Sequence, residues 1–224
     1  MTRLLYPHQS QPGAERLAPL LALSLLTMLL TGCGALNNVV AGPTITPAPP
    51  GGTVLESPRN LPDFTLTAQT GDPLSLSDLR GKPVLMAFGY THCPDVCPVT
   101  LAQFNQIARA LGEDRDRVAF VFVSVDGQRD TPERLAQYLR AFNPDFIGLT
   151  GDPETVRLIG TDYGVYFEYE QVAASQADYL VAHTTSWFLV DAEGRLRIIY
   201  AYGTPPEIVT TDIRAMLTQD EGAL

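Results

Sequence analysis

Two almost unbroken apolar runs, PVLMAFGY at residues 83–90 and VAFVFVSVD at residues 118–126, restrict the fold most strongly. Such runs are typical of strands that are buried on both faces of a sheet. Between them, apolar side chains recur at helical spacing, at Leu101, Phe104, Ile107, Ala108 and Leu111. Strand, helix and strand in this order predict a layered α/β domain.

The flanking segments add hairpins and further helices to this unit. One hairpin is expected over residues 61–79 and another over residues 186–202, each with a glycine-containing turn. Helices are expected to begin near residues 131, 152 and 204, where a Thr or Asp cap precedes Pro. We therefore expect a central mixed β-sheet flanked by helices, with an N-terminal β-hairpin.

Composition excludes several classes of protein. The net charge is −10 and Lys82 is the single lysine, which argues against nucleic-acid binding because no basic surface is available for phosphates. Only one stretch is apolar enough to enter a bilayer, so a polytopic membrane protein is excluded. Three cysteines are too few for a disulfide-stapled scaffold.

The N-terminus contains an apolar run at residues 17–30 that follows Arg16 and precedes Thr-Gly-Cys. Its length suits a signal peptide, although an uncleaved anchor helix is the alternative. Residues 30–33, LTGC, resemble a bacterial lipoprotein box, which implies lipidation of Cys33. We expect a signal peptide over 1–32, a Pro/Gly-rich tether over 33–60 and a folded domain over 61–224. The domain would then lie on the periplasmic side of a bacterial cell membrane.

Cys93 and Cys97 lie where the first buried strand meets the next helix, within GYTHCPDVCP. A helix N-terminus favours thiolates, so both thiol pKa values are expected to fall. Separated by three residues, the two sulfurs can close a disulfide or hold a soft metal such as Cu(I) or Zn(II). A cysteine pair at this place in an α/β domain predicts a thioredoxin-like fold.

A third ligand has to come from elsewhere in the chain. His183, in DYLVAHTT just before a predicted strand, is the candidate, with a structural loop histidine as the alternative. His92 also competes, but adjacent residues rarely direct their side chains at one point. We therefore expect His92 beside the site or at the surface.

The segments GYTHCPDVCPVTL, VFVSVDGQRDTPERLAQYL, FIGLTGD and DYLVAHTT resemble the Sco (SenC/PrrC) family of copper-binding thioredoxin-like proteins. The resemblance implies that Cys93, Cys97 and His183 bind a copper ion. It also implies a role at the binuclear copper centre of cytochrome c oxidase subunit II, on the outer face of the membrane. Other copper chaperones or thioredoxin-like reductants are further partners of this kind of protein.

The sequence departs from the family pattern at two positions. Ala182 stands where the family usually has Asp before the ligand His, which is expected to affect imidazole tuning or docking. Gly127 replaces Pro in SVDGQRDTP. The preceding Asp126 either supports the metal face or a partner contact, or caps a turn.

Two functions remain open at this point. A metallochaperone would need all three of Cys93, Cys97 and His183, and its Cys93–Cys97 disulfide would be the copper-free state. A thiol–disulfide oxidoreductase that keeps its target's cysteines reduced would need the cysteines alone.

Overall fold

A computed structural model describes residues 51–172 and 179–221, all within one compact unit, Ala48–Leu224. The strands are β1 (Thr53–Asn60), β2 (Thr65–Ala68), β3 (Pro73–Ser75), β4 (Val84–Gly89), β5 (Ala119–Ser124), β6 (Ile147–Thr150), β7 (Phe167–Gln171), β8 (Tyr179–His183), β9 (Trp187–Val190) and β10 (Arg195–Tyr200). The α-helices are α2 (Val96–Leu111), α3 (Pro132–Arg140), α4 (Pro153–Tyr163) and α5 (Pro206–Glu221). Short 3₁₀ helices occupy Leu76–Leu79 and Gly112–Arg117.

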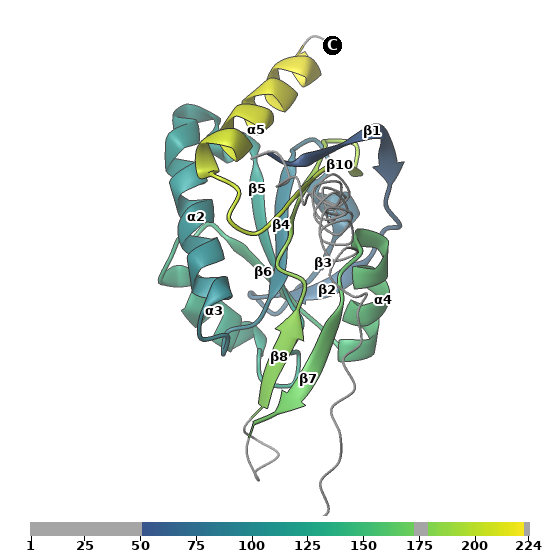
Figure 1. The fold of residues 1–224 in the computed structure, drawn as a ribbon, viewed down its shortest axis with the longest axis vertical. Coiled ribbons are helices and arrows are strands. Elements are labelled where there is room, and N and C mark those ends of the chain that lie inside the picture. The colour runs from purple at the N-terminus through teal and green to yellow at the C-terminus, as the bar shows by residue number, and fades with distance from the viewer. Residues whose placement is uncertain (1–50, 173–178, 222–224) are drawn as a thin grey trace, which may run out of the picture. The chain divides into compact units, whose positions relative to one another are not determined.

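A mixed sheet forms the centre of the domain, with strand order β1-β10-β9-β4-β5-β6-β2-β3 (Figure 1). The central β4, β5 and β6 are parallel, and β9 joins β4 antiparallel. All six residues of β4 and of β5 are buried, which confirms the two predicted core strands. The predicted hairpins are also present as β2–β3 and β9–β10.

Helices cover both faces of the sheet. Trp187 and Phe188 are neighbours in β9, so their side chains point to opposite faces. The Trp187 ring meets Phe104 of α2 at a centroid distance of 5.3 Å, and Phe188 meets Tyr163 of α4 at 5.3 Å. Helices α2 and α4 therefore lie on opposite faces, with α3 and α5 beside α2 (Figure 1). The mixed α/β architecture agrees with the predicted class.

Two of the three predicted helix starts carry the expected cap, whereas the Thr204 hydroxyl donates to the Ala201 carbonyl oxygen and α5 begins at Pro206. The Thr131 hydroxyl accepts the Arg134 N–H at 3.3 Å, and the Asp152 carboxylate accepts the N–H groups of Glu154 and Thr155. Pro occupies the first turn of both helices, where its missing N–H costs no hydrogen bond. Local capping chemistry thus fixes where α3 and α4 begin.

Some strands differ from the expectation. Residues 53–60, predicted as part of the tether, form β1 and pair antiparallel with β10. Seven of the eight β1 residues are exposed, so the strand lacks the apolar alternation that reveals strands in sequence. The short strand β6 and the separate two-stranded ribbon β7–β8 were also not predicted.

The apolar run at 17–30 and Cys33 lie outside the described residues. Within the described part of the chain, no helix combines the length and hydropathy needed to cross a membrane.

Candidate metal centre

The two cysteines lie at the carboxyl end of the central strand β4. Cys97 is the second residue of α2 and is 2% exposed. Cys93 lies in the preceding loop, where its N–H donates to the Tyr90 carbonyl oxygen at 3.3 Å, and its side chain is partly exposed. The sequence placed both on one helical turn, but only Cys97 is in the helix. The outer thiol is consequently accessible and the inner one is enclosed.

Gly89, the last residue of β4, makes room for the inner sulfur. A Cβ atom at this position would lie 2.6 Å from Cys97 Sγ and 2.8 Å from the Phe122 ring. Such contacts are too close for any side chain, so glycine is required for this placement of Cys97. Sequence reasoning did not identify Gly89, because nothing local indicates which atom faces it.

His183 reaches the cysteines from the end of β8. Its Nε2 lies 3.5 Å from Cys97 Sγ, although 86 residues separate the two along the chain. The Tyr90 ring meets the His183 imidazole edge to face at 5.8 Å. One donor atom from each of Cys93, Cys97 and His183 lies within 4.8 Å of the others. The three residues singled out in the sequence are therefore brought together, with His183 at a strand end rather than in a loop.

Hydrogen bonding selects the His183 tautomer. Nδ1 lies 2.9 Å from the Thr184 carbonyl oxygen, which only accepts, so Nδ1 carries the proton. In the neutral ring the Nε2 lone pair then faces the sulfurs, which is the arrangement typical of metal-binding histidines. The Thr184 N–H in turn donates to the Tyr166 carbonyl oxygen at 2.9 Å, which fixes this end of the ribbon.

The two thiols differ in acidity. A hydrogen bond from Cys97 lowers the pKa of Cys93 well below its ordinary value, against the opposing effect of burial. The same hydrogen bond, together with burial, raises the pKa of Cys97. The sequence predicted a fall for both thiols, so the prediction for Cys97 is wrong because its sulfur is buried and donates to a thiolate. The two opposite shifts favour a thiolate on Cys93 and a proton on Cys97.

This donor set fits a soft metal ion. Two sulfurs and a neutral imidazole nitrogen suit Cu(I) or Zn(II) better than hard cations, which prefer oxygen. Cys93 and His183 are both partly exposed, so an ion can be reached by an incoming ligand from outside. Binding at this site requires loss of the Cys97 proton.

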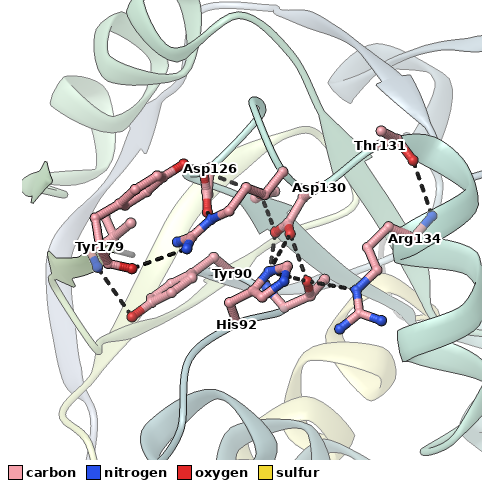
Figure 2. A network of polar contacts seen from close by, with 11 residues as sticks. Tyr90, His92, Asp126, Asp130, Thr131, Arg134 and Tyr179 are labelled. Atoms are coloured by element: carbon pink, nitrogen blue, oxygen red, sulfur yellow. Dashed lines mark hydrogen bonds and ion pairs between the residues drawn. The ribbon is translucent and has the colours of Figure 1, made fainter. Parts of the chain in front are cut away.

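A second group of titratable residues includes Asp126, Asp130 and His92, the residue before Cys93 (Figure 2). Both Asp126 oxygens accept hydrogen bonds, from Arg129 Nε at 2.5 Å and from the Tyr179 hydroxyl at 2.7 Å. Asp130 is fully buried and accepts from Thr91. Half-exposed His92 directs Nδ1 toward Asp130 at 3.8 Å. The Asp126 side chain therefore binds the ribbon through Tyr179.

The two departures from the family pattern have distinct surroundings. Ala182 is exposed on the outer face of the ribbon, opposite Glu168 of β7, and adjacent positions in a strand alternate between faces. At Gly127, a Cβ atom would clash with the Gly151 carbonyl oxygen. Residue 182 thus faces away from the cysteines, and residue 127 is confined by backbone.

The chain is similar in sequence to known proteins over most of its length. A sequence model described as SCO1/SenC matches residues 54–218. A SCO2-like protein from Rickettsia felis is 33% identical over 148 residues, which are 66% of this chain and 72% of that protein.

Solved structures agree with the sequence match. The ScoI structure from Bradyrhizobium japonicum, with copper bound, is 39% identical with a TM-score of 0.64, covering 70% of this chain and 99% of ScoI. A SCO1/SenC family lipoprotein from Bacillus anthracis is 28% identical with a TM-score of 0.64, covering 73% of this chain and 99% of that one. The fold is thus that of thioredoxin-like Sco proteins, and the chain belongs to the SCO1/SenC family.

Proposed function

We propose that this protein binds one copper ion through Cys93, Cys97 and His183 and delivers it to the binuclear copper site of cytochrome c oxidase subunit II. The observation that carries the proposal is the convergence of two sulfurs and an imidazole nitrogen within 4.8 Å. Copper bound in the B. japonicum relative supports the choice of metal. Family membership supports the role in oxidase assembly.

Each of the three residues of the site has its own part in binding and releasing the ion. The partly exposed Cys93 thiolate would meet the ion first, Cys97 would then give up its proton, and His183 Nε2 would complete the set. Three ligands leave room for a donor from the acceptor protein, so transfer can proceed by ligand exchange. Oxidation of the cysteines to a disulfide removes both sulfur donors, and redox state therefore controls loading.

The proposed place of action is the periplasmic face of a bacterial membrane. Cleavage after residue 32 would leave Cys33 as a lipidated N-terminus, and the description of the B. anthracis relative as a lipoprotein supports this reading. Since β1 begins at Thr53, the tether would span residues 33–52 and not extend to 60. Copper donors and thioredoxin-like reductants on that side are the expected further partners.

The test is a competition titration of the reduced protein with Cu(I) under anaerobic conditions. Wild type should bind one equivalent, and His183→Ala should bind at least tenfold more weakly while its cysteines still form a disulfide. His92→Ala is the matched control, because His92 is adjacent to Cys93 but points to Asp130. Equal affinities for wild type and His183→Ala would contradict the three-ligand site.

A thiol–disulfide oxidoreductase is the second candidate. A partly exposed Cys93 thiolate in front of a protonated Cys97 is the arrangement of an attacking and a resolving thiol. This activity would reduce copper-site cysteines of the target and would survive His183→Ala. Reduction of a disulfide-containing target peptide, with copper affinity unchanged in that variant, would favour this function over the first.

A further inference from the structure

His183 and the cysteines stand on different parts of the fold. The cysteines follow β4, in the centre of the main sheet, whereas His183 ends β8 of a ribbon that forms its own two-stranded sheet. No ladder of strand hydrogen bonds joins this ribbon to the main sheet in the described residues. Apart from the short connection of residues 184–186 to β9, side-chain contacts therefore set the distance between the imidazole and the sulfurs.

Arg129 contacts the beginning of β8 at two points and Asp126 at a third. From the loop after β5, its Nε pairs with Asp126 at 2.5 Å and its Nη1 donates to the Tyr179 carbonyl oxygen at 3.0 Å. The guanidinium also stacks on the Tyr179 ring, 3.6 Å from its centroid. The Tyr179 hydroxyl donates to Asp126 at 2.7 Å, which closes the cluster (Figure 2). The backbone, ring and hydroxyl of Tyr179 are thus all engaged.

Tyr90 connects this cluster to the metal centre. Its hydroxyl accepts the Val181 N–H at 3.1 Å, and the Arg129 guanidinium lies 5.8 Å from its ring centroid. The same ring contacts the His183 imidazole. Since Tyr90 begins the loop that carries Cys93, contacts run continuously from Arg129 through the ribbon and Tyr90 to two of the proposed ligands.

Stability alone does not account for this buried pair. Asp126 is fully buried, Arg129 is 20% exposed, and Arg129 Nη2 is buried without a hydrogen-bond acceptor among the described residues. Desolvation of such a pair offsets much of its attraction, and apolar replacements are often as stable. The planar Arg129 guanidinium, however, bonds to Asp126 and to the Tyr179 carbonyl oxygen while it stacks on the Tyr179 ring. Such a group is well suited to fixing the position of β8.

We propose that Arg129 is a positioning residue for the metal centre: through Asp126 and Tyr179 it locks the β7–β8 ribbon so that His183 Nε2 faces the cysteines. This inference rests on the proposed copper site and adds the residue that sets its third ligand. Arg129 itself need not touch the ion.

The test is a double-mutant cycle on Cu(I) affinity, with Arg129→Lys introduced into wild type and into His183→Ala. Lysine keeps a charge opposite Asp126, which preserves the fold, but it cannot bond both Asp126 and the Tyr179 carbonyl while stacking. We expect an affinity loss of at least tenfold in wild type and less than twofold in His183→Ala, because Arg129 acts through His183. Equal losses in the two backgrounds would overturn the proposal.

Arg195→Lys is the matched control. Arg195 Nε pairs with Asp191 at 2.9 Å, and Asp191 is 1% exposed, so this is also an arginine paired with a buried carboxylate. Asp191 follows Val190, which pairs with Val84 at the end of β4 opposite the cysteines. Copper affinity should be unchanged in this variant. A loss as large as that of Arg129→Lys would show a general effect on the fold and overturn the positioning role.

A copper-free measurement separates this inference from the proposed function. In the reduced metal-free protein, Arg129→Lys should accelerate hydrogen exchange at the Val181 and Thr184 amides at least fivefold, with α2 amides unchanged. If wild type failed to bind copper, the proposed function would fall, while faster ribbon exchange would still support the positioning of His183. Unchanged exchange at both amides would overturn the inference in either case.

Discussion

A Cβ atom on Gly89 would lie 2.6 Å from the Sγ of Cys97, so even the methyl group of an alanine at the end of β4 would overlap the inner sulfur. Gly89→Ala should therefore displace Cys97 and lower Cu(I) affinity at least tenfold. Overpacking of this kind costs about 1–3 kcal/mol in the free energy of unfolding. Competition titration and urea denaturation measure the two effects.

The control for that variant is Gly148→Ala in β6. There a Cβ atom would meet the Leu139 Cδ1 atom, also at 2.6 Å, but that atom ends a flexible side chain on α3. Stability should fall while copper affinity stays at the wild-type value. A similar loss of affinity in both variants would contradict a specific role for Gly89.

The lowered pKa of Cys93 predicts an unusual pH dependence of alkylation. Because its thiolate persists as the pH falls, iodoacetamide should modify Cys93 in the reduced metal-free protein at nearly equal rates at pH 8 and pH 6. An ordinary thiol loses about 80-fold in thiolate over that interval. Mass spectrometry should find Cys97 unmodified.

Cys97→Ala tests the cause of this shift. Removal of the donated hydrogen bond should return the pKa of Cys93 toward its ordinary value, so the alkylation rate should again fall steeply below pH 8. A steep fall already present in wild type would contradict the shared-proton pair.

Ala182→Asp should leave copper affinity within twofold of wild type, because residue 182 is on the outer face of the ribbon. The new carboxylate would stand opposite Glu168, and like charges across a strand pair cost about 0.2–1 kcal/mol. Thermal denaturation should show that cost, and Ala182→Asn, which adds no charge, should not. A tenfold change in copper affinity would mean that this position does reach the imidazole.

Gly127→Ala should lower the free energy of unfolding by an amount near the upper end of about 1–3 kcal/mol, because its Cβ would clash with the backbone carbonyl oxygen of Gly151. Backbone cannot move aside as a side-chain tip does. The exposed neighbour Gln128 provides the control, and Gln128→Ala should be neutral in urea denaturation. Equal stability of the two variants would show that the loop adjusts freely.

The sequence was most informative where chemistry is local. Continuous apolar runs predicted β4 and β5. Thr131 and Asp152 predicted where α3 and α4 begin, because a capping side chain bonds only to the first turn of its own helix. It also identified all three residues of the candidate site, since their residue types are rare in this chain. Strand β1 gave no signal, as it is exposed on both faces.

Other features depend on long-range placement. The β7 segment does alternate, with Phe167 and Tyr169 less exposed than Glu168 and Glu170, and this period of two could have revealed the ribbon. By contrast, the space that Gly89 leaves for a sulfur and the contact of Arg129 with Tyr179 arise only when distant segments meet. The opposite pKa shifts of the two thiols likewise depend on burial that spacing does not show.

Cys97 and His183 lie 86 residues apart along the chain, one on a helix packed on the main sheet and the other on the β7–β8 ribbon. At the proposed copper site, an ion held by both would act as a removable crosslink that closes this loop and favours the folded chain for as long as it stays. Without that ion the ribbon would lose the restraint. Proteases should therefore digest the metal-free protein faster than the copper-loaded protein, so that loading can be read as resistance to proteolysis.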